Sequence, residues 1–314
     1  KRSKVRSRIV ADQLVKLIKE ADHVVIMGHR MSDLDAIGSA EGVLRICKIC
    51  DVPAVIAVRR DATLAGSLIN ALIAAGQEDD FIDPKGALPI ISQRTLCIVV
   101  DTYQLGLVES REILEKCGKV AVIDHHRKGV GFIEKADLVC HEPYASSASE
   151  LVTEFLQYVG DRDDKPNRIE AEGLLSGIML DTRDFTLHTG VRTFEAAAAL
   201  RRYGAETEHV RQLFDVSMVE YTTKARLVSE AQMYRGCAIT VSGEVAPEAR
   251  VAIAQAANDL LTIQNVEASF VAVQVGGGVN ISARSLGAVN VQVIMESLGG
   301  GGHQTMAAAQ LKHI

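Results

Sequence analysis

Short apolar runs alternate with longer amphipathic segments through the first two thirds of the chain. Four runs have the length and the β-branched content of strands: 23–27, 52–58, 96–100 and 120–123. Helical spacing of apolar residues predicts helices over 9–20, 37–50 and 105–116. This alternation predicts an α/β fold with a parallel sheet. Because several strands are apolar at consecutive positions, we expect helices on both faces of the sheet.

The pattern changes twice after residue 147. Residues 147–227 are mostly helical, with a polar interruption at 161–167 and an alanine-rich helix through 196–200. From about residue 236 the alternation returns, with expected strands at 238–241, 268–275 and 279–283 and helices at 251–261 and 289–298. Glycines 276–278 are expected to form a hairpin turn. We therefore predict a parallel-sheet domain over 1–215, a helical connector over 216–235 and a smaller α/β domain over 236–314.

Charge and composition narrow the classes of function. The 314 residues include 34 Lys and Arg against 40 Asp and Glu, a formal net charge of −6, which disfavours a broad basic surface for long nucleic acid. No apolar run approaches the roughly 18 to 20 residues of a membrane span. Six scattered cysteines without a secretory signal indicate a reduced, cytoplasmic protein. The chain lacks an initiator Met and begins with a basic segment, so we expect it to be a soluble fragment of something longer.

Acidic and imidazole side chains recur just beyond the carboxyl ends of the predicted strands. These side chains are His29, Asp33, Asp35, Asp101, Asp124, His125 and His126, joined by Asp181 at the expected end of a helix. In an open α/β sheet, ligands bind beyond the carboxyl ends of the strands. We therefore expect these side chains to meet in one cleft.

Six of them form a candidate metal site: His29, Asp33, Asp35, Asp101, His125 and Asp181. Four carboxylates in one cleft would repel one another and raise their pKa values, whereas two divalent cations balance their charge. Six ligands over two ions leave positions for a bridging water and for substrate oxygens. Mixed carboxylate and imidazole ligation at a phosphoryl-transfer site favours Mn²⁺ over Mg²⁺, which takes nitrogen reluctantly, and over Zn²⁺, which prefers fewer ligands.

Each of these residues also has a simpler interpretation. An Asp after a strand is more often a helix N-cap, and Asp33 or Asp35 could cap the helix that begins near Ala36. Asp124 fits the same interpretation, and a single His is more often structural. The metal site is nevertheless favoured, because independent caps have no reason to fall repeatedly at one edge of the sheet.

The motifs at these positions resemble those of the DHH/DHHA1 phosphoesterases. They are His29-x-x-x-Asp33-x-Asp35-Ala36-x-Gly38-Ser39, Asp101-Thr102, Asp124-His125-His126 and Gly177-x-x-Leu180-Asp181-Thr182, and they stand in the family's order. The resemblance implies one Mn²⁺ held by His29, Asp33 and Asp101. It implies a second held by Asp35, His125 and Asp181, with Asp101 bridging the two. It also implies that Asp124 supports the metal ligands without binding a metal ion itself, and that His126 faces the scissile phosphate.

The second domain carries a further resemblance. Residues 297–303, Ser-Leu-Gly-Gly-Gly-Gly-His, are similar to the glycine-rich DHHA1 signature. Glycines after a helix can present consecutive N–H groups as an anion-binding nest, and the apolar flanks favour an ordered turn over a flexible linker. Substrate contacts are expected from His126, Arg284, Gly300, Gly301, Gly302 and His303. Arg284 is expected to place its positive charge against the nucleotide. Gln310 stands where family members often carry Gly.

One branch of the family fits the paired aspartates best. Many members read Pro-Asp-Gly-Asp where this chain has Ser32-Asp33-Leu34-Asp35. This version, with the basic lead-in over 1–20, looks like the catalytic region of the membrane-bound cyclic di-AMP phosphodiesterases of the GdpP type. It implies manganese-dependent hydrolysis of cyclic di-AMP to linear 5′-pApA by two-metal in-line attack. The catalytic region would face the cytoplasm, the full-length protein would be membrane-anchored, and a homodimer is compatible with the resemblance.

Two alternatives stay open from the sequence. The nearest is an oligoribonuclease (nanoRNase) and pAp phosphatase of the same family, which would share the metal ligands. The other, from a different class, is a non-catalytic sensor of cyclic dinucleotides. A processive exonuclease is disfavoured by the acidic balance and by the lack of an additional nucleic-acid-binding domain.

Overall fold

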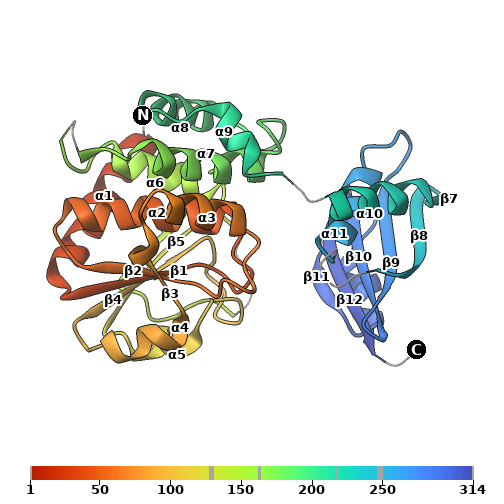
Figure 1. The fold of residues 1–314 in the computed structure, drawn as a ribbon, viewed down its shortest axis with the longest axis horizontal. Coiled ribbons are helices and arrows are strands. Elements are labelled where there is room, and N and C mark those ends of the chain that lie inside the picture. Colours follow the sequence, from red (N-terminus) through yellow and green to blue (C-terminus); the bar gives the residue numbers. More distant parts are fainter. Residues whose placement is uncertain (1, 127–130, 162–163, 216–217, 246–249, 313–314) are drawn as a thin grey trace. The chain divides into compact units, whose positions relative to one another are not determined.

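The chain forms two compact units, Lys1–Phe214 and Asp215–Ile314, and each encloses apolar cores of its own. The structure is a computed structural model that describes residues 2–126, 131–161, 164–215, 218–245 and 250–312 (Figure 1). It confirms the predicted α/β class, with a parallel sheet in the first unit and a second sheet in the smaller unit. Across these described ranges, no helix combines the length and the apolar content needed to cross a bilayer.

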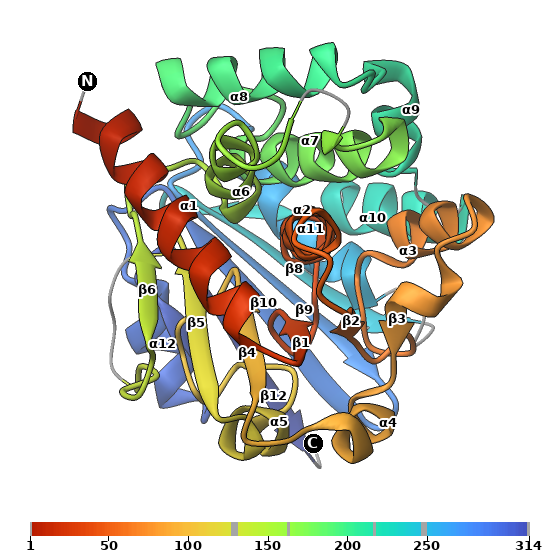
Figure 2. The same cartoon turned by 90° about the vertical axis from the view of Figure 1, so that its left-hand side faces the viewer.

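Six parallel strands form the sheet of the first unit, in the order β3-β2-β1-β4-β5-β6 (Figure 2). They are β1 (His23–Met27), β2 (Ala54–Ala57), β3 (Phe81–Ile82), β4 (Thr95–Val100), β5 (Lys119–Asp124) and β6 (Leu138–His141). The chain runs outward from β1 to β3 and then returns to place β4 on the other side of β1. The carboxyl ends of β1 and β4 therefore flank the topological switch point, where open α/β sheets bind their ligands.

Helices cover both faces of this sheet, as the apolar strands predict (Figure 1). They are α1 (Arg2–Glu20), α2 (Leu34–Ile49), α3 (Gly66–Ala74), α4 (Pro84–Ala87), α5 (Arg111–Lys116), α6 (Ala148–Leu156), α7 (Arg168–Thr182), α8 (Val191–Arg202) and α9 (Thr207–Gln212). Val24 and Ile26 of β1 belong to the core beneath α1, α2, α6 and α7, whereas Val25 and Met27 belong to the core beneath α4 and α5. Successive strand residues are thus buried on opposite faces.

The helix expected over 105–116 is wrong in its first half. Only Arg111–Lys116 is helical, because Ser110 caps the helix by accepting a hydrogen bond from the N–H of Ile113. The preceding residues pair with the loop after β1 instead: Leu107 accepts a hydrogen bond from the N–H of Arg30, and His29 forms a bridge with Val108. This segment therefore supports the loop that carries His29.

Glycines let α2 and α7 pack with their backbones in contact. A Cβ at Gly38 of α2 would lie 2.3 Å from the carbonyl oxygen of Gly173 of α7. A Cβ at Gly177 would lie 2.6 Å from Asp35 Oδ1. Because side chains at these positions would force the helices apart, the glycines fix the start of α2 against the end of α7. Asp35 and Asp181 lie on these two helix ends.

A buried acidic cluster lies farther along the same contact. Glu41 of α2 is fully buried, and its Oε1 accepts a hydrogen bond from Gln77 Nε2 at 2.8 Å. Gln77 Nε2 also lies 3.1 Å from Glu170 Oε1, and Glu170 is paired with Arg45 through two hydrogen bonds of 2.8 and 2.5 Å. Burial raises the pKa of Glu41 to about 8, and the neighbouring charge of Glu170 adds to the effect, so this carboxyl group is protonated in the folded protein at neutral pH.

Replacing Glu41 by glutamine is expected to flatten the pH dependence of stability. The pKa of Glu41 is about 8 in the folded state against 4.5 for the free side chain, so its stabilising effect is greatest below pH 4.5 and is lost as pH rises toward 8. The free energy of unfolding can fall by up to about 1.4 kcal/mol per pH unit, the slope expected when the folded state binds one more proton than the unfolded state. Urea unfolding of both proteins from pH 5 to 9 measures it. Parallel stability curves for Glu41→Gln and the parent would contradict this prediction.

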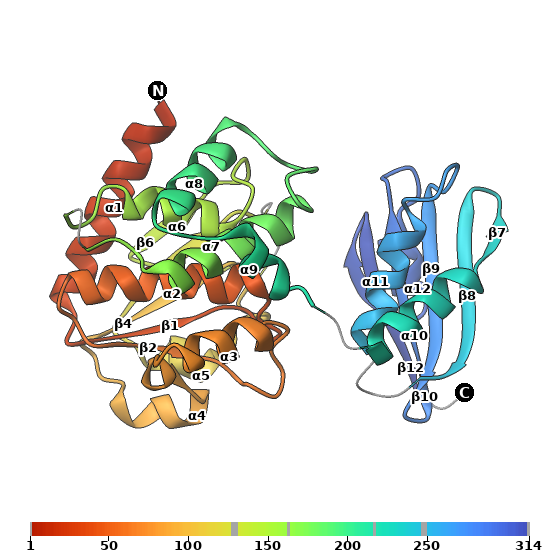
Figure 3. The same cartoon turned by 45° about the horizontal axis from the view of Figure 1, so that its top comes forward.

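The second unit contains a six-stranded sheet in the order β11-β12-β10-β9-β8-β7. Figure 3 shows β7 beside β8 at one edge of this sheet. Its elements are α10 (Met218–Ser229), β7 (Gln232–Tyr234), β8 (Cys237–Glu244), α11 (Arg250–Leu260), β9 (Ala268–Val275), β10 (Gly278–Ser285), α12 (Val291–Ser297), β11 (Gly301–His303) and β12 (Met306–Lys312). Strands β8 and β9 are parallel and the other pairs are antiparallel. The segment expected as a connector, 216–235, supplies α10 and β7, apart from residues 216–217, which lie outside the described residues.

Candidate metal centre

The loop after β1 places His29 and Asp33 at the switch point. Asp33 is the N-cap of α2, and its Oδ1 accepts hydrogen bonds from the N–H groups of Asp35 and Ala36 at 3.0 and 3.1 Å. The cap interpretation of Asp33 is therefore correct, but the same Oδ1 also lies 3.8 Å from His29 Nε2. Ser32 Oγ donates to the carbonyl oxygen of His29 at 2.6 Å and so closes the loop. Capping and a place in the candidate site are compatible for this residue.

Asp35 is fully buried in the first turn of α2. Its carboxylate oxygens accept hydrogen bonds from the N–H groups of Ala148 and Ser149, at 2.7 and 2.8 Å, in the first turn of α6. A helix N-terminus favours a negative charge, and Ser147 caps this helix. Burial nevertheless raises the pKa of Asp35 well above its usual value, and the charges of Asp101 and Asp181 act in the same direction. A cation beside Asp35 would relieve this repulsion.

Asp101 lies at the centre of the cluster, directly after β4. Its backbone has φ +56°, a left-handed conformation that Asp and Asn tolerate better than most residues. Its Oδ2 lies 3.5 Å from His29 Nε2 and its Oδ1 lies 3.3 Å from His125 Nε2. Burial alone would raise the pKa of Asp101, but these two imidazoles outweigh burial and lower it. The Asp101 carboxylate therefore stays ionised between two imidazole groups.

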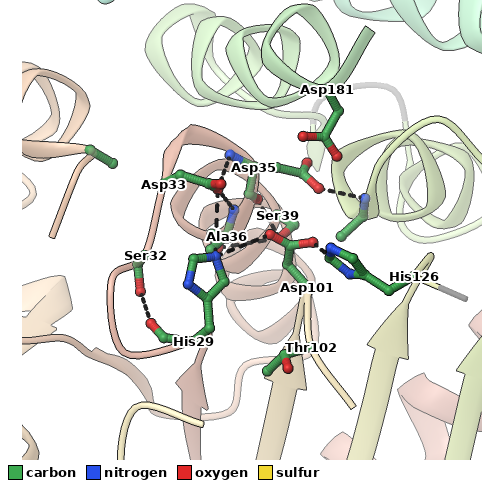
Figure 4. A network of polar contacts seen from close by, with 12 residues as sticks. His29, Ser32, Asp33, Asp35, Ala36, Ser39, Asp101, Thr102, His126 and Asp181 are labelled. Carbon is green, nitrogen blue, oxygen red and sulfur yellow. Dashed lines mark hydrogen bonds and ion pairs between the residues drawn. The ribbon is translucent and has the colours of Figure 1, made fainter. Parts of the chain in front are cut away.

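His125 joins Asp101 to the end of α7. His125 Nε2 lies 3.0 Å from Asp181 Oδ2 and 3.8 Å from Asp35 Oδ2. As expected, Asp181 lies in the last turn of a helix, α7, which ends at Thr182 and is capped by Arg183 in the left-handed conformation. Burial raises the pKa of Asp181 to about 6, despite its contact with His125. Figure 4 shows the carboxylates of Asp35, Asp101 and Asp181 close to one another.

His126 and Asp124 form a pair beside this cluster. Asp124 is fully buried, and its Oδ1 lies 2.8 Å from His126 Nδ1. A carboxylate accepts hydrogen bonds, so His126 keeps its proton on Nδ1 and presents Nε2 elsewhere. The side chain of His126 is 53% exposed. Burial lowers the pKa of His126, but the contact with Asp124 and the charge of Asp101 outweigh it, so the pKa is raised.

The six sequence-predicted side chains fall into two groups that share one residue. His29, Asp33 and Asp101 offer ligand atoms within 4.8 Å of one another, and so do Asp35, Asp101, His125 and Asp181. Asp101 Oδ1 and His125 Nε2 are buried, and among the described residues their contacts with each other and with Asp181 lack hydrogen-bond geometry. Buried polar atoms without a well-formed hydrogen bond are costly unless a further group satisfies them. The donor set, carboxylate oxygen and imidazole nitrogen, suits a divalent cation.

Contacts with carboxylates raise the pKa values of both imidazoles in this cluster. Burial lowers the pKa of His29, but the contacts with Asp101 and Asp33 outweigh it and raise the pKa to about 10. The pKa of His125 is raised to about 12 by Asp101 and Asp181, also against burial. Because a metal binds neutral imidazole, each His must release a proton for ligation.

The N–H groups of Ala148 and Ser149 are contacts of the candidate site that the sequence did not predict. They come from residues more than a hundred positions away from Asp35. The available signal was a helix start: Ser147 accepts a hydrogen bond from the N–H of Glu150, the spacing typical of an N-cap. The sequence shows that a helix begins at this position, but not which carboxylate lies against it.

The glycine run of the second unit does not form the expected nest of free N–H groups. The N–H groups of Gly299 and Gly300 donate to the carbonyl oxygens of Glu296 and Met295 and so end α12. Gly301, Gly302 and His303 form the edge strand β11 against β12. Glycine is required at Gly300, where a Cβ would lie 2.1 Å from the carbonyl oxygen of Ala308. The run is therefore ordered, as predicted, but as a helix end and a strand.

The remaining predicted substrate residue of this unit is Arg284. It lies on β10, and its Nε donates to Asn258 Oδ1 of α11 at 2.9 Å. Its Nη1 lies 3.2 Å from Ser282 Oγ. These contacts hold the guanidinium group on the α11 face of the second sheet. The side chain of His303 lies outside the described residues.

Two family domains match the chain. Residues 23–178 match the DHH family, N-terminal domain, and residues 245–313 match the DHHA1 domain. The chain is 46% identical to the cyclic-di-AMP phosphodiesterase GdpP of Geobacillus thermodenitrificans and 42% identical to the cyclic-di-AMP phosphodiesterase PdeA of Listeria monocytogenes. Each alignment covers 100% of this chain and 48% of the relative. The chain thus spans about half the length of these curated relatives.

A solved structure shows the same fold. An exopolyphosphatase-related protein from Bacteroides fragilis matches with a TM-score of 0.80 and 21% sequence identity, over 96% of this chain and 90% of that one.

Proposed function

Because the chain belongs to the DHH family and carries a DHHA1 domain, we propose that it is a manganese-dependent phosphodiesterase that hydrolyses cyclic di-AMP to linear 5′-pApA. One observation carries the proposal: six side chains from four separate segments meet as two candidate metal groups that share Asp101. The identity to two cyclic-di-AMP phosphodiesterases over the whole of this chain supports the choice of substrate.

The proposed cofactor is a pair of Mn²⁺ ions. His29, Asp33 and Asp101 would hold one ion, Asp35, His125 and Asp181 would hold the other, and Asp101 would bridge them. When bound, such ions supply Lewis-acid stabilisation of phosphate charge and activation of a water molecule. The mixture of oxygen and nitrogen ligands is the reason to propose manganese over magnesium.

His126 is proposed to act on the phosphate. Asp124 fixes its ring through the 2.8 Å contact at Nδ1, which leaves Nε2 for the substrate. Because its pKa is raised above the usual value of 6.5, the imidazole is protonated to a greater extent than a free histidine at the same pH. His126 can therefore neutralise a phosphate oxygen or donate a proton to the departing ribose oxygen, while Asp124 keeps the ring oriented.

The second unit is proposed to bind the far nucleotide through Arg284, Gly300, Gly301, Gly302 and His303. Replacing His303 by alanine is expected to raise KM for cyclic di-AMP while kcat stays within about 3-fold, since the loss of one binding contact costs roughly 1 kcal/mol. Steady-state kinetics at saturating Mn²⁺ measure both constants. An unchanged KM would remove His303 from substrate recognition.

A product analysis tests the proposed reaction. The protein is incubated with Mn²⁺ and, separately, with cyclic di-AMP, pApA and pAp, and the products are separated by chromatography. Conversion of cyclic di-AMP to pApA is the expected result. Preference for pApA or pAp would support the oligoribonuclease and pAp phosphatase instead, and binding of cyclic di-AMP without turnover would support a sensor.

Assembly and location are proposals from the resemblance. The relatives GdpP and PdeA are about twice as long as this chain. By analogy with the family, we propose that the whole protein is attached to the membrane and that its catalytic region faces the cytoplasm. The activity of the whole protein is proposed in the same way. A homodimer is proposed on the same ground.

A further inference from the structure

The second unit contains a groove on the α11 face of its sheet. The groove has a volume of about 560 Å³, within the range of small-molecule sites. Ile253 and Ala254 of α11 form one side, and Gly299 and Gly300 also line it. Strands β10 and β12 form the floor, which the small side chain of Ala308 leaves open.

Two primary amides lie side by side on this floor. Asn280 of β10 and Gln310 of β12 are direct partners in the antiparallel register, so their side chains project from the same face, roughly 5 Å apart at Cβ. In the part of the chain that the structure describes, neither amide makes a hydrogen bond with another residue. Each therefore offers one carbonyl oxygen acceptor and one NH₂ donor to the groove.

The lining favours a neutral, polar and flat ligand. Apart from Ser282, the other described lining residues are aliphatic or glycine, and none of the described lining residues is charged. Among the described lining residues, a phosphate would find no counter-charge. On β10 the cation on this face is Arg284, four residues beyond Asn280, and its Nη1 lies 3.2 Å from Ser282 Oγ. The groove thus offers amides at one end and leads toward a guanidinium group at the other, as a nucleotide's base and phosphate require.

We infer that this groove takes an adenine base and that Asn280 and Gln310 are the residues that determine base specificity. The inference rests on the proposed function and deepens it. An amide matches adenine because its oxygen accepts from the N6 amino group while its NH₂ donates to the adjacent ring nitrogen. Ala254 of α11, which is partly exposed, supplies apolar contact for the base.

Carboxylate substitutions test this pairing. Asn280→Asp and Gln310→Glu keep the shape of each side chain but remove its donor, so a ring nitrogen of adenine would face an acceptor. The ratio of kcat/KM for cyclic di-AMP to that for cyclic di-GMP is expected to fall about 5-fold or more in each variant, mainly through KM. An unchanged ratio in both variants and in the double variant would overturn the inference.

Two controls separate specificity from damage. Gln274→Glu makes the same charge change at an exposed position of β9, opposite Val279 and on the other face of this sheet, and is expected to leave the ratio unchanged. Hydrolysis of bis(p-nitrophenyl) phosphate, which carries no base, is expected to be equal in all variants. A comparable fall of the ratio in Gln274→Glu would overturn the inference, because the effect would then be one of charge alone.

A binding experiment keeps this inference distinct from the proposed reaction. If the parent protein cleaves neither cyclic dinucleotide, the proposed function fails, and the groove is tested by titrating AMP and GMP into ¹⁵N-labelled protein. AMP is expected to shift the side-chain amide signals of Asn280 and Gln310, assigned by their loss in the variants, and GMP is expected to shift them less. No shift with AMP, or equal shifts with both nucleotides, would overturn the inference.

Discussion

Replacing Asp101 by asparagine is expected to reduce kcat for cyclic di-AMP by about 10³-fold or more, because each metal-dependent contribution to phosphoryl transfer is worth several kcal/mol. Among the described residues, one candidate metal group contains His29 and another contains Asp181, and Asp101 is the only residue that belongs to both. Its loss is therefore expected to weaken both groups. Asparagine is preferred to alanine because the backbone at this position has φ +56°, where Asn is tolerated and Ala is strained. Activity and Mn²⁺ binding by titration calorimetry are measured together.

The Asp101→Ala variant is also expected to lack turnover, but it mixes backbone strain with ligand loss. Asp22→Asn is a matched control, since Asp22 is exposed, pairs with Arg94 and precedes β1 at the opposite edge of the sheet. This control should keep activity and Mn²⁺ binding. Near-normal hydrolysis by Asp101→Asn, with the fold intact by circular dichroism, would reject the bridging role of Asp101.

Replacing Gly177 by alanine is expected to destabilise the first unit by about 1–3 kcal/mol and to weaken Mn²⁺ binding. The new Cβ would lie 2.3 Å from Ser149 Oγ, 2.6 Å from Asp35 Oδ1 and 2.8 Å from Asp35 Cα. The Ser149 hydroxyl can rotate away, but the Asp35 Cα belongs to the backbone of α2 and moves only if the helix moves. The strain outweighs the gain of up to about 1 kcal/mol that alanine brings to a helix. Urea unfolding and Mn²⁺ titration measure the two effects.

Gly66→Ala provides the matched control for this substitution. Gly66 is the first residue of α3, and a Cβ there meets no atom within 4 Å. Without a clash, this variant is expected to be as stable as the parent or slightly more stable. If Gly177→Ala matched Gly66→Ala in stability and in Mn²⁺ affinity, the close approach of α2 and α7 would not be what positions Asp35.

The sequence predicted the central strands well because they are buried on both faces. The run 23–27 is recovered as β1 with the same bounds, and Val24 through Met27 are all buried. The edge strands were missed because they lack this continuous burial. Strand β3 has only two residues, and β6 alternates between buried and exposed positions over four, so neither gives a strong apolar signal.

The candidate site was predictable in its residues but not in its supports. The rule that ligands bind beyond the carboxyl ends of parallel strands was enough to group His29, Asp101 and His125. The contact of Asp35 with the start of α6 depends on tertiary packing, which no local pattern encodes. The glycine run shows the converse, since its composition indicates an ordered turn, but hydrogen bonding by α12 uses the N–H groups of Gly299 and Gly300.

The division into two units has a consequence for the stability measurements. Each unit has separate apolar cores, so thermal unfolding of the chain is expected to be the sum of two cooperative events, and one midpoint does not describe it. The chain contains no tryptophan, so intrinsic indole fluorescence cannot tell the events apart. Differential scanning calorimetry can, because unfolding enthalpy scales with size and the larger heat-absorption peak belongs to the 1–214 unit. In such scans, the effects of substitutions at Glu41 and Gly177 are to be read from that peak, and in urea from the transition of the same unit.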